Sequence, residues 1–81
     1  MTLLYFAWVR QKIGKGEEQM TPPAGDVAAL IAHLTNLGPN SADAFADRSR
    51  IRVAVNQHHA GLDAKIGPDD EVAFFPPVTG G

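Results

Sequence analysis

The side chains able to do chemistry in this 81-residue sequence are few, and none forms a catalytic or metal-binding pattern. His33 lies off the apolar stripe of a predicted helix, and His58 and His59 are adjacent in a predicted turn, where neighbouring rings usually point apart. Carboxylates occur in short runs at predicted turns and strand edges, where solvated acids are common. The sequence has no cysteine, which excludes disulfides and thiolate chemistry within the chain. We expect no metal site.

Two basic patterns suggest anion binding only weakly. The segment Gly14 to Gly16 is too short for a phosphate-binding loop and lacks its Gly-x-x-x-x-Gly-Lys-Ser/Thr spacing. Arg48, Arg50 and Arg52 alternate, so a strand would place them on one face. They could contact an anion or a partner there, but we favour a charged strand edge that discourages aggregation.

The remaining candidate is the end of the sequence, Glu71 to Gly81, which reads EVAFFPPVTGG. Pro76 and Pro77 cannot donate to a sheet ladder, so they should end the preceding strand and stiffen the backbone into an extended direction. Val78 and Thr79 favour extended backbone because they are β-branched. At about 3.1 Å per residue, segment 77–81 would project roughly 15 Å and could thread a narrow channel in a partner.

The two final glycines carry no side chain, which would leave the carbonyl of Gly81 open to attack. An α-carboxylate is an unreactive anion at neutral pH, so a partner must activate it, for instance by adenylation with ATP. A sulfur nucleophile or an amine could then attack the acyl-adenylate. The alternative is a frayed terminus without function. The preceding proline pair and the predicted fold favour the functional interpretation.

The elements that must position this segment follow from hydrophobic periodicity. We expect strands over Leu3–Val9, Glu17–Thr21, Ile51–Asn56 and Glu71–Phe75. A helix should begin after Asp26 as its N-cap and end before Gly38 and Pro39. Segment 39–49 is predicted to be a polar loop anchored by Phe45, and a short segment near Ala64 to Ile66 follows the histidine turn.

This order predicts an α+β, ubiquitin-like β-grasp fold, with a mixed sheet of four to five strands and one main helix packed on it. The strongly apolar first and last strands suit neighbouring central positions. We expect one domain, residues 1–76, followed by an extended tail, residues 77–81.

Composition excludes several classes of protein. The sequence is 44% hydrophobic and 20% charged, with a net charge of −2, which is typical of a globular domain and argues against general binding to nucleic acid or anionic membranes. The apolar amino-terminal stretch is too short to span a membrane and lacks the basic region of a signal peptide. We therefore expect a cytoplasmic protein with no nucleic-acid or membrane partner.

Three segments together resemble the small, sulfur-carrier subunits of molybdopterin synthase. They are YFAWVR (Tyr5–Arg10), VAVNQ (Val53–Gln57) and DDEVAFFPPVTGG (Asp69–Gly81). The resemblance covers the whole length, and EVAFFPPVTGG is its most specific part. The sequence departs from the family at Asp69, where glycine is frequent, and at His58–Gly61, where a more apolar stretch is expected.

The resemblance implies a sulfur-transfer cycle centred on Gly81. An E1-like enzyme would adenylate this carboxylate with ATP and magnesium, and a sulfurtransferase would convert it to a thiocarboxylate. The thiocarboxylate would then donate sulfur to cyclic pyranopterin monophosphate in the large subunit of a heterotetrameric synthase, forming the molybdopterin dithiolene. The chain would bind no cofactor itself and would be a protein co-substrate rather than an enzyme on its own.

The same resemblance assigns roles to other residues. Threading of the partner's channel would fall to Val78, Thr79 and Gly80. Contacts with the partner would fall to Phe75, Pro76, Pro77 and Arg10. Consecutive strand residues face opposite sides, so we expect Phe74 and Phe75 to divide between core and surface, with Phe75 facing the partner; the alternative is that both are core.

Three other functions remain open at this point. A thiamine-pathway sulfur carrier would share the fold and the tail chemistry, although such carriers are usually shorter and lack FFPPVTGG. A ubiquitin-like modifier would form isopeptide bonds with lysines of target proteins. A plain β-grasp interaction module would carry an inert tail.

Overall fold

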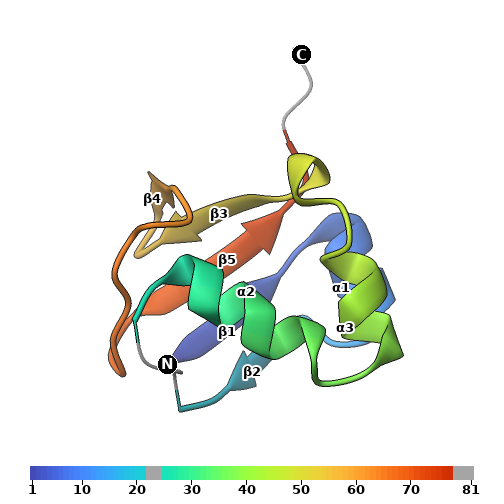
Figure 1. Ribbon diagram of the computed structural model, residues 1–81, viewed down its shortest axis with the longest axis horizontal. Coiled ribbons are helices and arrows are strands. Elements are labelled where there is room, and N and C mark those ends of the chain that lie inside the picture. Colours follow the sequence, from blue (N-terminus) through green and yellow to red (C-terminus); the bar gives the residue numbers. More distant parts are fainter. Residues whose placement is uncertain (22–24, 78–81) are drawn as a thin grey trace.

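A five-stranded mixed sheet forms the centre of the molecule (Figure 1). The computed structural model describes residues 1–21 and 25–77. The strands are β1 (Thr2–Tyr5), β2 (Glu17–Gln19), β3 (Arg52–Val55), β4 (His58–Ala60) and β5 (Glu71–Phe75). The helices are α1 (Ala7–Ile13), α2 (Val27–Thr35) and α3 (Pro39–Ala44), and a 3₁₀ turn, η1, spans Arg48–Arg50. The strand order across the sheet is β2-β1-β5-β3-β4.

Strand β5 occupies the middle of the sheet, parallel to β1 on one side and antiparallel to β3 on the other. Val72 and Phe74 are both fully buried, and they alternate with Ala73 and Phe75 on the opposite face. Burial of β1 alternates in the same way. The prediction that the first and last strands take neighbouring central positions is therefore confirmed.

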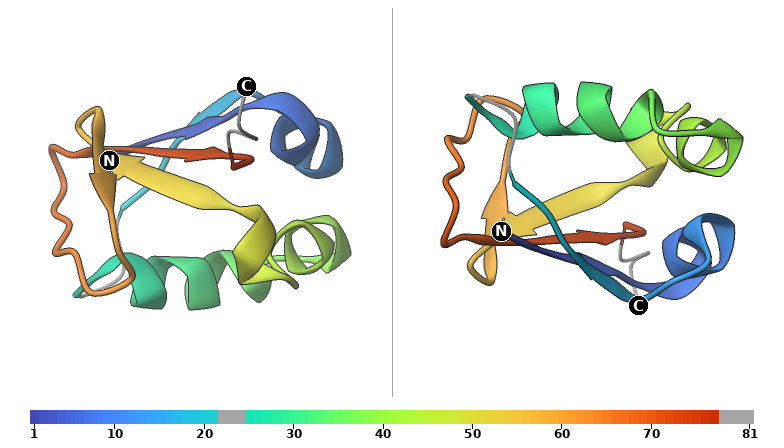
Figure 2. Two further views of the ribbon diagram at one scale, coloured as in Figure 1. Left: turned by 90° about the horizontal axis from the view of Figure 1, so that it is seen from above. Right: turned by 90° about the horizontal axis from the view of Figure 1, so that it is seen from below.

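Helix α2 covers one face of this sheet, whereas α1 and α3 pack together at the end where β1 and β5 finish (Figure 2). The predicted N-cap is confirmed, because the backbone N–H of Ala29 donates to Asp26 Oδ1 at 2.9 Å. The apolar stripe of α2 faces the sheet and consists of Val27, Leu30, Ile31 and Leu34. Lys12 on α1 and Asp43 on α3 form an ion pair of 2.6 Å between the other two helices.

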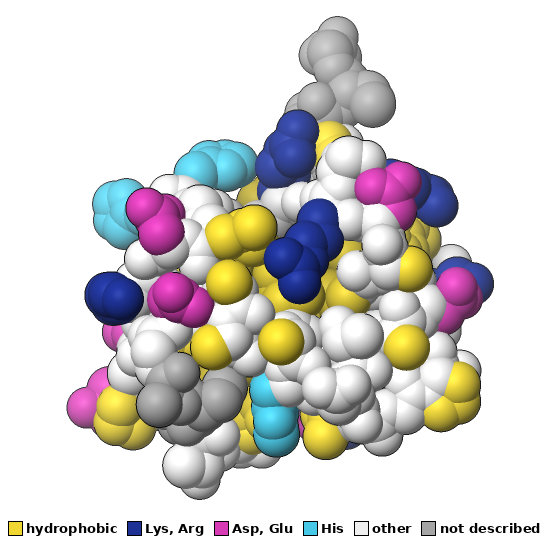
Figure 3. Space-filling view, in the orientation of Figure 1, with side chains coloured by type: hydrophobic (Ala, Val, Ile, Leu, Met, Phe, Trp, Pro, Cys, Tyr) yellow, Lys and Arg dark blue, Asp and Glu magenta, His cyan; other side chains and the backbone are white. Residues whose placement is uncertain are grey.

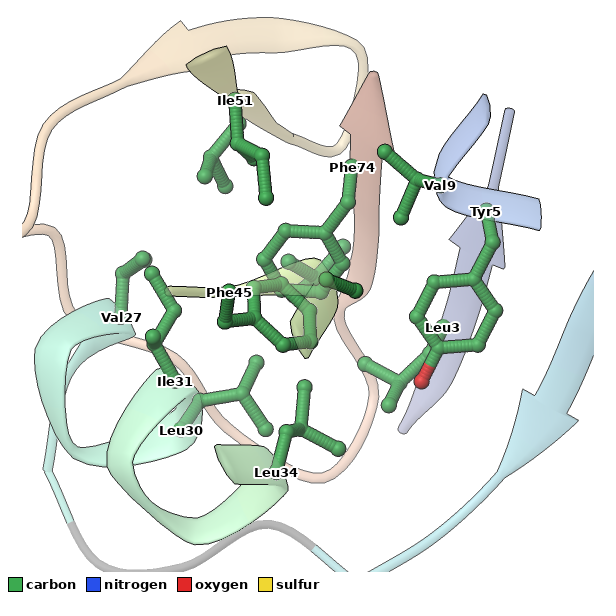
Figure 4. Packing of buried hydrophobic residues seen from close by; sticks show 13 residues of the cluster. Leu3, Tyr5, Val9, Val27, Leu30, Ile31, Leu34, Phe45, Ile51 and Phe74 are labelled. Atoms are coloured by element: carbon green, nitrogen blue, oxygen red, sulfur yellow. The ribbon is translucent and has the colours of Figure 1, made fainter. Parts of the chain in front are cut away.

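The core lies between α2 and the inner face of the sheet (Figure 4). Phe74 projects into its centre and makes an edge contact with Phe45, with ring centroids 5.0 Å apart. Tyr5 stacks on the other side of Phe74 at 5.9 Å. The predicted anchor role of Phe45 is confirmed, because its side chain is only 3% exposed.

The prediction of one strand over Leu3–Val9 is wrong in its second half. β1 ends at Tyr5, and helix α1 begins at Ala7, whose φ of 53° lies in the left-handed region and turns the chain. A continuous apolar run fits a buried strand or a buried helix equally well. The helix buries Val9 completely and leaves Phe6 49% exposed. Gly14 ends this helix: it has φ 94°, and its N–H donates to Arg10 O at 2.8 Å.

The predicted polar loop over 39–49 contains regular structure. Pro39 occupies the first turn of α3, where its missing N–H costs nothing and its fixed φ favours the helix. The Gly38-Pro39 pair therefore starts a helix, and α2 ends earlier, at Thr35. Arg48 and Arg50 lie in the 3₁₀ turn η1, so the prediction that they share a strand face with Arg52 is also wrong.

The predicted turn at His58 and His59 is likewise corrected, because both residues lie in strand β4. Asn56 and Gln57, with φ of 51° and 70°, make the two-residue turn between β3 and β4. These angles are those of a type I′ hairpin turn, a geometry that usually selects Asn-Gly. Gln57 stands where that glycine is usual, so the hairpin could not be predicted from its turn residues.

Candidate functional site

The residues predicted to carry the sulfur and to enter the partner lie outside the described part of the chain. Gly81, which we predict to carry sulfur, and the threading segment Val78, Thr79 and Gly80 all fall in residues 78–81. The described part of the site is its base, namely the end of β5 with Pro76 and Pro77, both partly buried. The candidate site is thus built from the strand that leads into the tail.

The end of β5 is held on both sides. The N–H of Phe6 donates to Phe74 O at 3.1 Å, which continues the pairing with β1 to the end of the strand. On the other side, Arg52 of β3 pairs with Phe75. Because β1 and β3 both contact its final residues, β5 sets the direction in which the chain leaves the sheet.

Phe74 and Phe75 face opposite sides of the sheet, as the strand period requires. Phe74 is 0% exposed and belongs to the core, whereas Phe75 is partly buried on the face away from α2. The ring of Phe75 packs edge-on against His59, with centroids 5.7 Å apart and an interplanar angle of 72°. The predicted division between core and surface is confirmed; the partner contact of Phe75 stays a prediction.

An apolar surface extends from Phe75 across the outer face, which we define as the side of the sheet away from α2. Leu4, Ala73 and Ala54 lie opposite one another on β1, β5 and β3. His59 of β4 pairs with Ala54 and ends this row. Leu4, Ala73 and Ala54 are each partly exposed, so this face presents a row of apolar side chains beside Phe75.

Arg10 lies on α1, apart from this row. Its side chain is exposed and packs against the backbone of Gly16, where an added Cβ would come within 3.2 Å of Arg10 Nε. Arg10 also borders an open hollow of about 490 Å³, together with Ala7, Gln11 and Gly14. The structure therefore keeps Phe75, Pro76 and Pro77 together and places Arg10 on the helix beyond β1.

The strongest electrostatic perturbations support the sheet. Tyr5 Oη donates to Glu18 Oε1 at 2.5 Å, and Lys15 Nζ donates to Glu18 Oε2 at 2.8 Å. Burial raises the pKa of Tyr5 well above its usual range, and the hydrogen bond to Glu18 adds to this effect. Burial also raises the pKa of Glu18, but the hydrogen bonds from Lys15 and Tyr5 outweigh it and leave that pKa lowered. This group ties β2 to β1.

A second network fixes the turn that leads into β5. Asp70 Oδ2 accepts from the N–H of Gly67 at 2.7 Å, and its Oδ1 accepts from Asn56 Nδ2 at 2.9 Å. The hydrogen bond from Asn56 lowers the pKa of Asp70, and the bond from Gly67 adds to it. Asn56 Oδ1 in turn accepts from the N–H of Glu71 at 3.0 Å. These carboxylate and amide groups are engaged in holding β5 in register.

Neither a metal-binding cluster nor a membrane-spanning helix is found among the described residues. In residues 1–21 and 25–77, no three His, Cys, Asp or Glu side chains lie close enough together to hold a metal ion. No helix in the same ranges has the length and apolar character needed to cross a membrane.

One group near the end of β5 was not predicted from the sequence. The guanidinium of Arg50 lies 4.9 Å from the ring centroid of Trp8, which joins η1 to α1. Arg48 and Arg52 line a hollow of about 190 Å³ with the apolar residues Ile51, Val53, Ala60 and Leu62 and with Gly61. The alternation of the arginines was visible in the sequence, but the pairing of Arg52 with Phe75 depends on the order of the strands.

Solved structures define the class of protein as ubiquitin-like β-grasp. The chain superposes on SAMP1 from Haloferax volcanii with a TM-score of 0.75 at 24% identity, covering 100% of this chain and 98% of that one. The solution structure of the small archaeal modifier protein 1 from Methanosarcina acetivorans gives a TM-score of 0.74 at 22% identity, covering 99% and 94%. The predicted fold class is thereby confirmed.

The family model described as the ThiS family matches residues 3–81, and the chain belongs to this family. The chain is 36% identical over 81 residues to the molybdopterin synthase sulfur carrier subunit of Haemophilus influenzae, covering 100% of this chain and 99% of the relative. It is 38% identical over 79 residues to the protein of the same name from Escherichia coli, covering 98% and 96%. The resemblance found in the sequence is confirmed.

Proposed function

We propose that this chain is the sulfur carrier subunit of a molybdopterin synthase and that Gly81 carries the sulfur. The observation that carries this proposal is full-length similarity to proteins of that name, at 36–38% identity. The match to the family model extends through residue 81, so it includes the Gly-Gly ending.

The proposed cycle activates the carboxylate and then exchanges oxygen for sulfur. An E1-like enzyme transfers AMP from ATP, with magnesium, to a carboxylate oxygen of Gly81 and releases pyrophosphate. A sulfide-level sulfur nucleophile delivered by a sulfurtransferase then attacks the acyl carbon, so that the C–S bond forms as the C–O bond to AMP breaks; AMP and a proton leave, and a thiocarboxylate remains. In the large subunit of a heterotetramer, the thiocarboxylate gives its sulfur to cyclic pyranopterin monophosphate. Two such transfers supply both dithiolene sulfurs.

The described structure suits the task of presenting such a tail. β5 is paired on both sides, so its end is a fixed point from which the proline pair directs the chain. Phe75 contributes an aromatic contact on the outer face beside that point, and Arg10 adds a polar contact from α1. In this arrangement the sheet face docks on the partner while residues 78–81 enter its channel.

Intact mass spectrometry tests the proposal. Protein incubated with the activating enzyme, ATP, magnesium and a sulfur donor should gain the mass of sulfur replacing one oxygen, localised to Gly81 by fragmentation. A variant with one alanine added after Gly81 is the matched control and should stay unmodified. An unchanged mass of the native chain under conditions that modify a known carrier would refute the proposal.

A reconstitution separates this function from the alternatives. The thiocarboxylated chain, mixed with the large synthase subunit and cyclic pyranopterin monophosphate, should form the dithiolene product. A thiamine-pathway carrier would be thiocarboxylated but would form none. A protein modifier would instead give conjugates that survive denaturing electrophoresis and disappear on deletion of Gly81.

A further inference from the structure

Three of the four arginines of the chain lie between residues 48 and 52, and we call Arg48, Arg50 and Arg52 the arginine rim. All three are exposed. Protection of a strand edge explains Arg52 at most. β4 pairs with β3 only from Val53 to Val55, which leaves that side of β3 uncovered at Arg52, whereas Arg48 and Arg50 lie in η1, outside the strand.

The arginine rim borders the point where β5 ends. Arg52 pairs directly with Phe75, and Arg50 stacks over Trp8 of α1. Lys and Arg side chains gather over η1 and around the end of β5 in the space-filling view (Figure 3). The rim thus combines cationic groups with apolar and aromatic surface, including Leu62, which is 43% exposed.

The rim forms no close ion pair in the described part of the chain. The ion pairs found among residues 1–21 and 25–77 are Lys12–Asp43 and Lys15–Glu18, and neither involves the rim. Asp47 accepts hydrogen bonds from the N–H and hydroxyl of Ser49 and also interacts electrostatically with Arg50, so it offsets part of the charge of the rim.

Negative charge gathers instead at the opposite end of β5. Asp69, Asp70 and Glu71 precede or begin the strand, whereas the rim borders its last residue. Five strand residues span roughly 13 Å from first to last. The amino terminus offsets part of this negative charge, because it interacts electrostatically with Asp70. Although the whole chain has a net charge of −2, acidic side chains therefore gather where β5 begins and arginines gather where it ends and the tail leaves.

We propose that the arginine rim docks on an acidic protein surface beside the channel of the large subunit that receives the tail. This inference rests on the proposed function and adds the chemistry of the contact. Guanidinium groups bind carboxylates through paired hydrogen bonds, and a rim of arginines around an aromatic centre matches the anatomy of protein interfaces. The polarised charge orients the domain on approach, so the tail reaches the partner first.

Charge reversal tests this inference by stopped-flow association of the full chain with the purified large subunit. The variant Arg48→Glu/Arg52→Glu spares Arg50 and its contact with Trp8. We expect its association rate to fall about tenfold or more at low salt and to lose most of its salt dependence. Lys65→Glu, a reversal at an exposed site outside the rim, should change the rate less than about twofold. Urea unfolding of each variant checks that the fold is retained.

The outcomes separate the two proposals. If the native chain is thiocarboxylated and binds the large subunit, but the double variant associates with an unchanged rate and salt dependence, the rim inference is wrong and the proposed function stands. Equal slowing by Lys65→Glu would also overturn it, since net charge alone would then explain the effect. Rim-dependent binding of a DNA or RNA duplex that competes with the large subunit would assign the rim to nucleic acid instead. If the native chain is neither thiocarboxylated nor bound, the proposed function fails and the inference with it.

Discussion

Phe74→Ala should mainly lower the stability of the domain, whereas Phe75→Ala should mainly weaken binding to the large subunit. Phe74 is fully buried between Tyr5 and Phe45, so Phe74→Ala leaves a cavity and removes two aromatic contacts. Such truncations cost about 3–5 kcal/mol. A domain of this size has a free energy of unfolding of roughly 4–12 kcal/mol, so Phe74→Ala should remove at least about a quarter of this free energy.

Phe75→Ala should be milder for the fold. Phe75 is partly buried, and its main aromatic neighbour is His59 on the outer face. Full burial of a phenylalanine is worth about 1.5–3 kcal/mol, so partial burial together with the contact to His59 gives a loss of about 1–2 kcal/mol. An aromatic residue at the centre of an interface contributes about 2 kcal/mol or more, which corresponds to a roughly thirtyfold weaker Kd for the large subunit.

Two measurements check this pair. Urea unfolding followed by the fluorescence of Trp8, the single tryptophan, gives stability, and titration calorimetry with the large subunit gives Kd. With a slope of about 1 kcal/mol per molar urea, Phe74→Ala should lower the midpoint by about 3 M or more and Phe75→Ala by about 1–2 M. Phe75→Leu, which keeps an apolar side chain, should recover part of the affinity. Equal stability losses in the two alanine variants, or native affinity in Phe75→Ala, would refute the reasoning.

Three further predictions concern the supports of the sheet. Gln57→Gly should raise the free energy of unfolding in urea by about 1 kcal/mol, because Gln57 has a φ of 70°, which glycine adopts without strain. Asn56 also has a positive φ, of 51°, but Asn56→Gly should destabilise the domain because it removes two side-chain hydrogen bonds. Asp26→Ala should lower the free energy of unfolding by about 1 kcal/mol, because it removes the N-cap of α2. Asp26→Asn, which can still cap the helix, should lower it much less. Equal losses in the two variants would contradict capping. The lowered pKa of Glu18 contributes stability above its unfolded value of about 4.3, and this contribution is lost as pH falls through the folded value. Glu18→Gln should therefore flatten the acid limb of the midpoint-versus-pH curve, and an unchanged limb would exclude the contribution.

The sequence was informative where residue types mark the ends of an element. The apolar segment Glu71–Phe75, ended by the proline pair, predicted β5 with its observed bounds, and the N-cap at Asp26 located the start of α2. The prediction failed where one pattern fits two structures, because the run Leu3–Val9 is apolar enough for a strand or a helix. The left-handed conformation of Ala7 decides between them, and no glycine marks this position in the sequence. Pro39 is equally suited to follow one helix or to begin another.

The two parts of the candidate site, the tail and the arginine rim, also differ in how well they could be predicted from the sequence. The tail is a contiguous segment, so its residue types alone suggested its use. The arginine rim depends on β3 lying inside the sheet, beside β5, and strand order is set by pairing between segments far apart in the sequence. The alternating arginines alone could not distinguish an edge strand from a docking surface.

The central position of β5 also has a mechanical consequence. Four residue pairs join it to β1 and four join it to β3, and both ladders run alongside the direction in which the chain leaves the sheet. A pulling force applied beyond Phe75 therefore loads both ladders in shear, so their hydrogen bonds share the load and must rupture together. An edge strand such as β4 would instead be peeled away one bond at a time. The domain would therefore act as a rigid anchor if, as we propose, a partner binds the tail and later releases it.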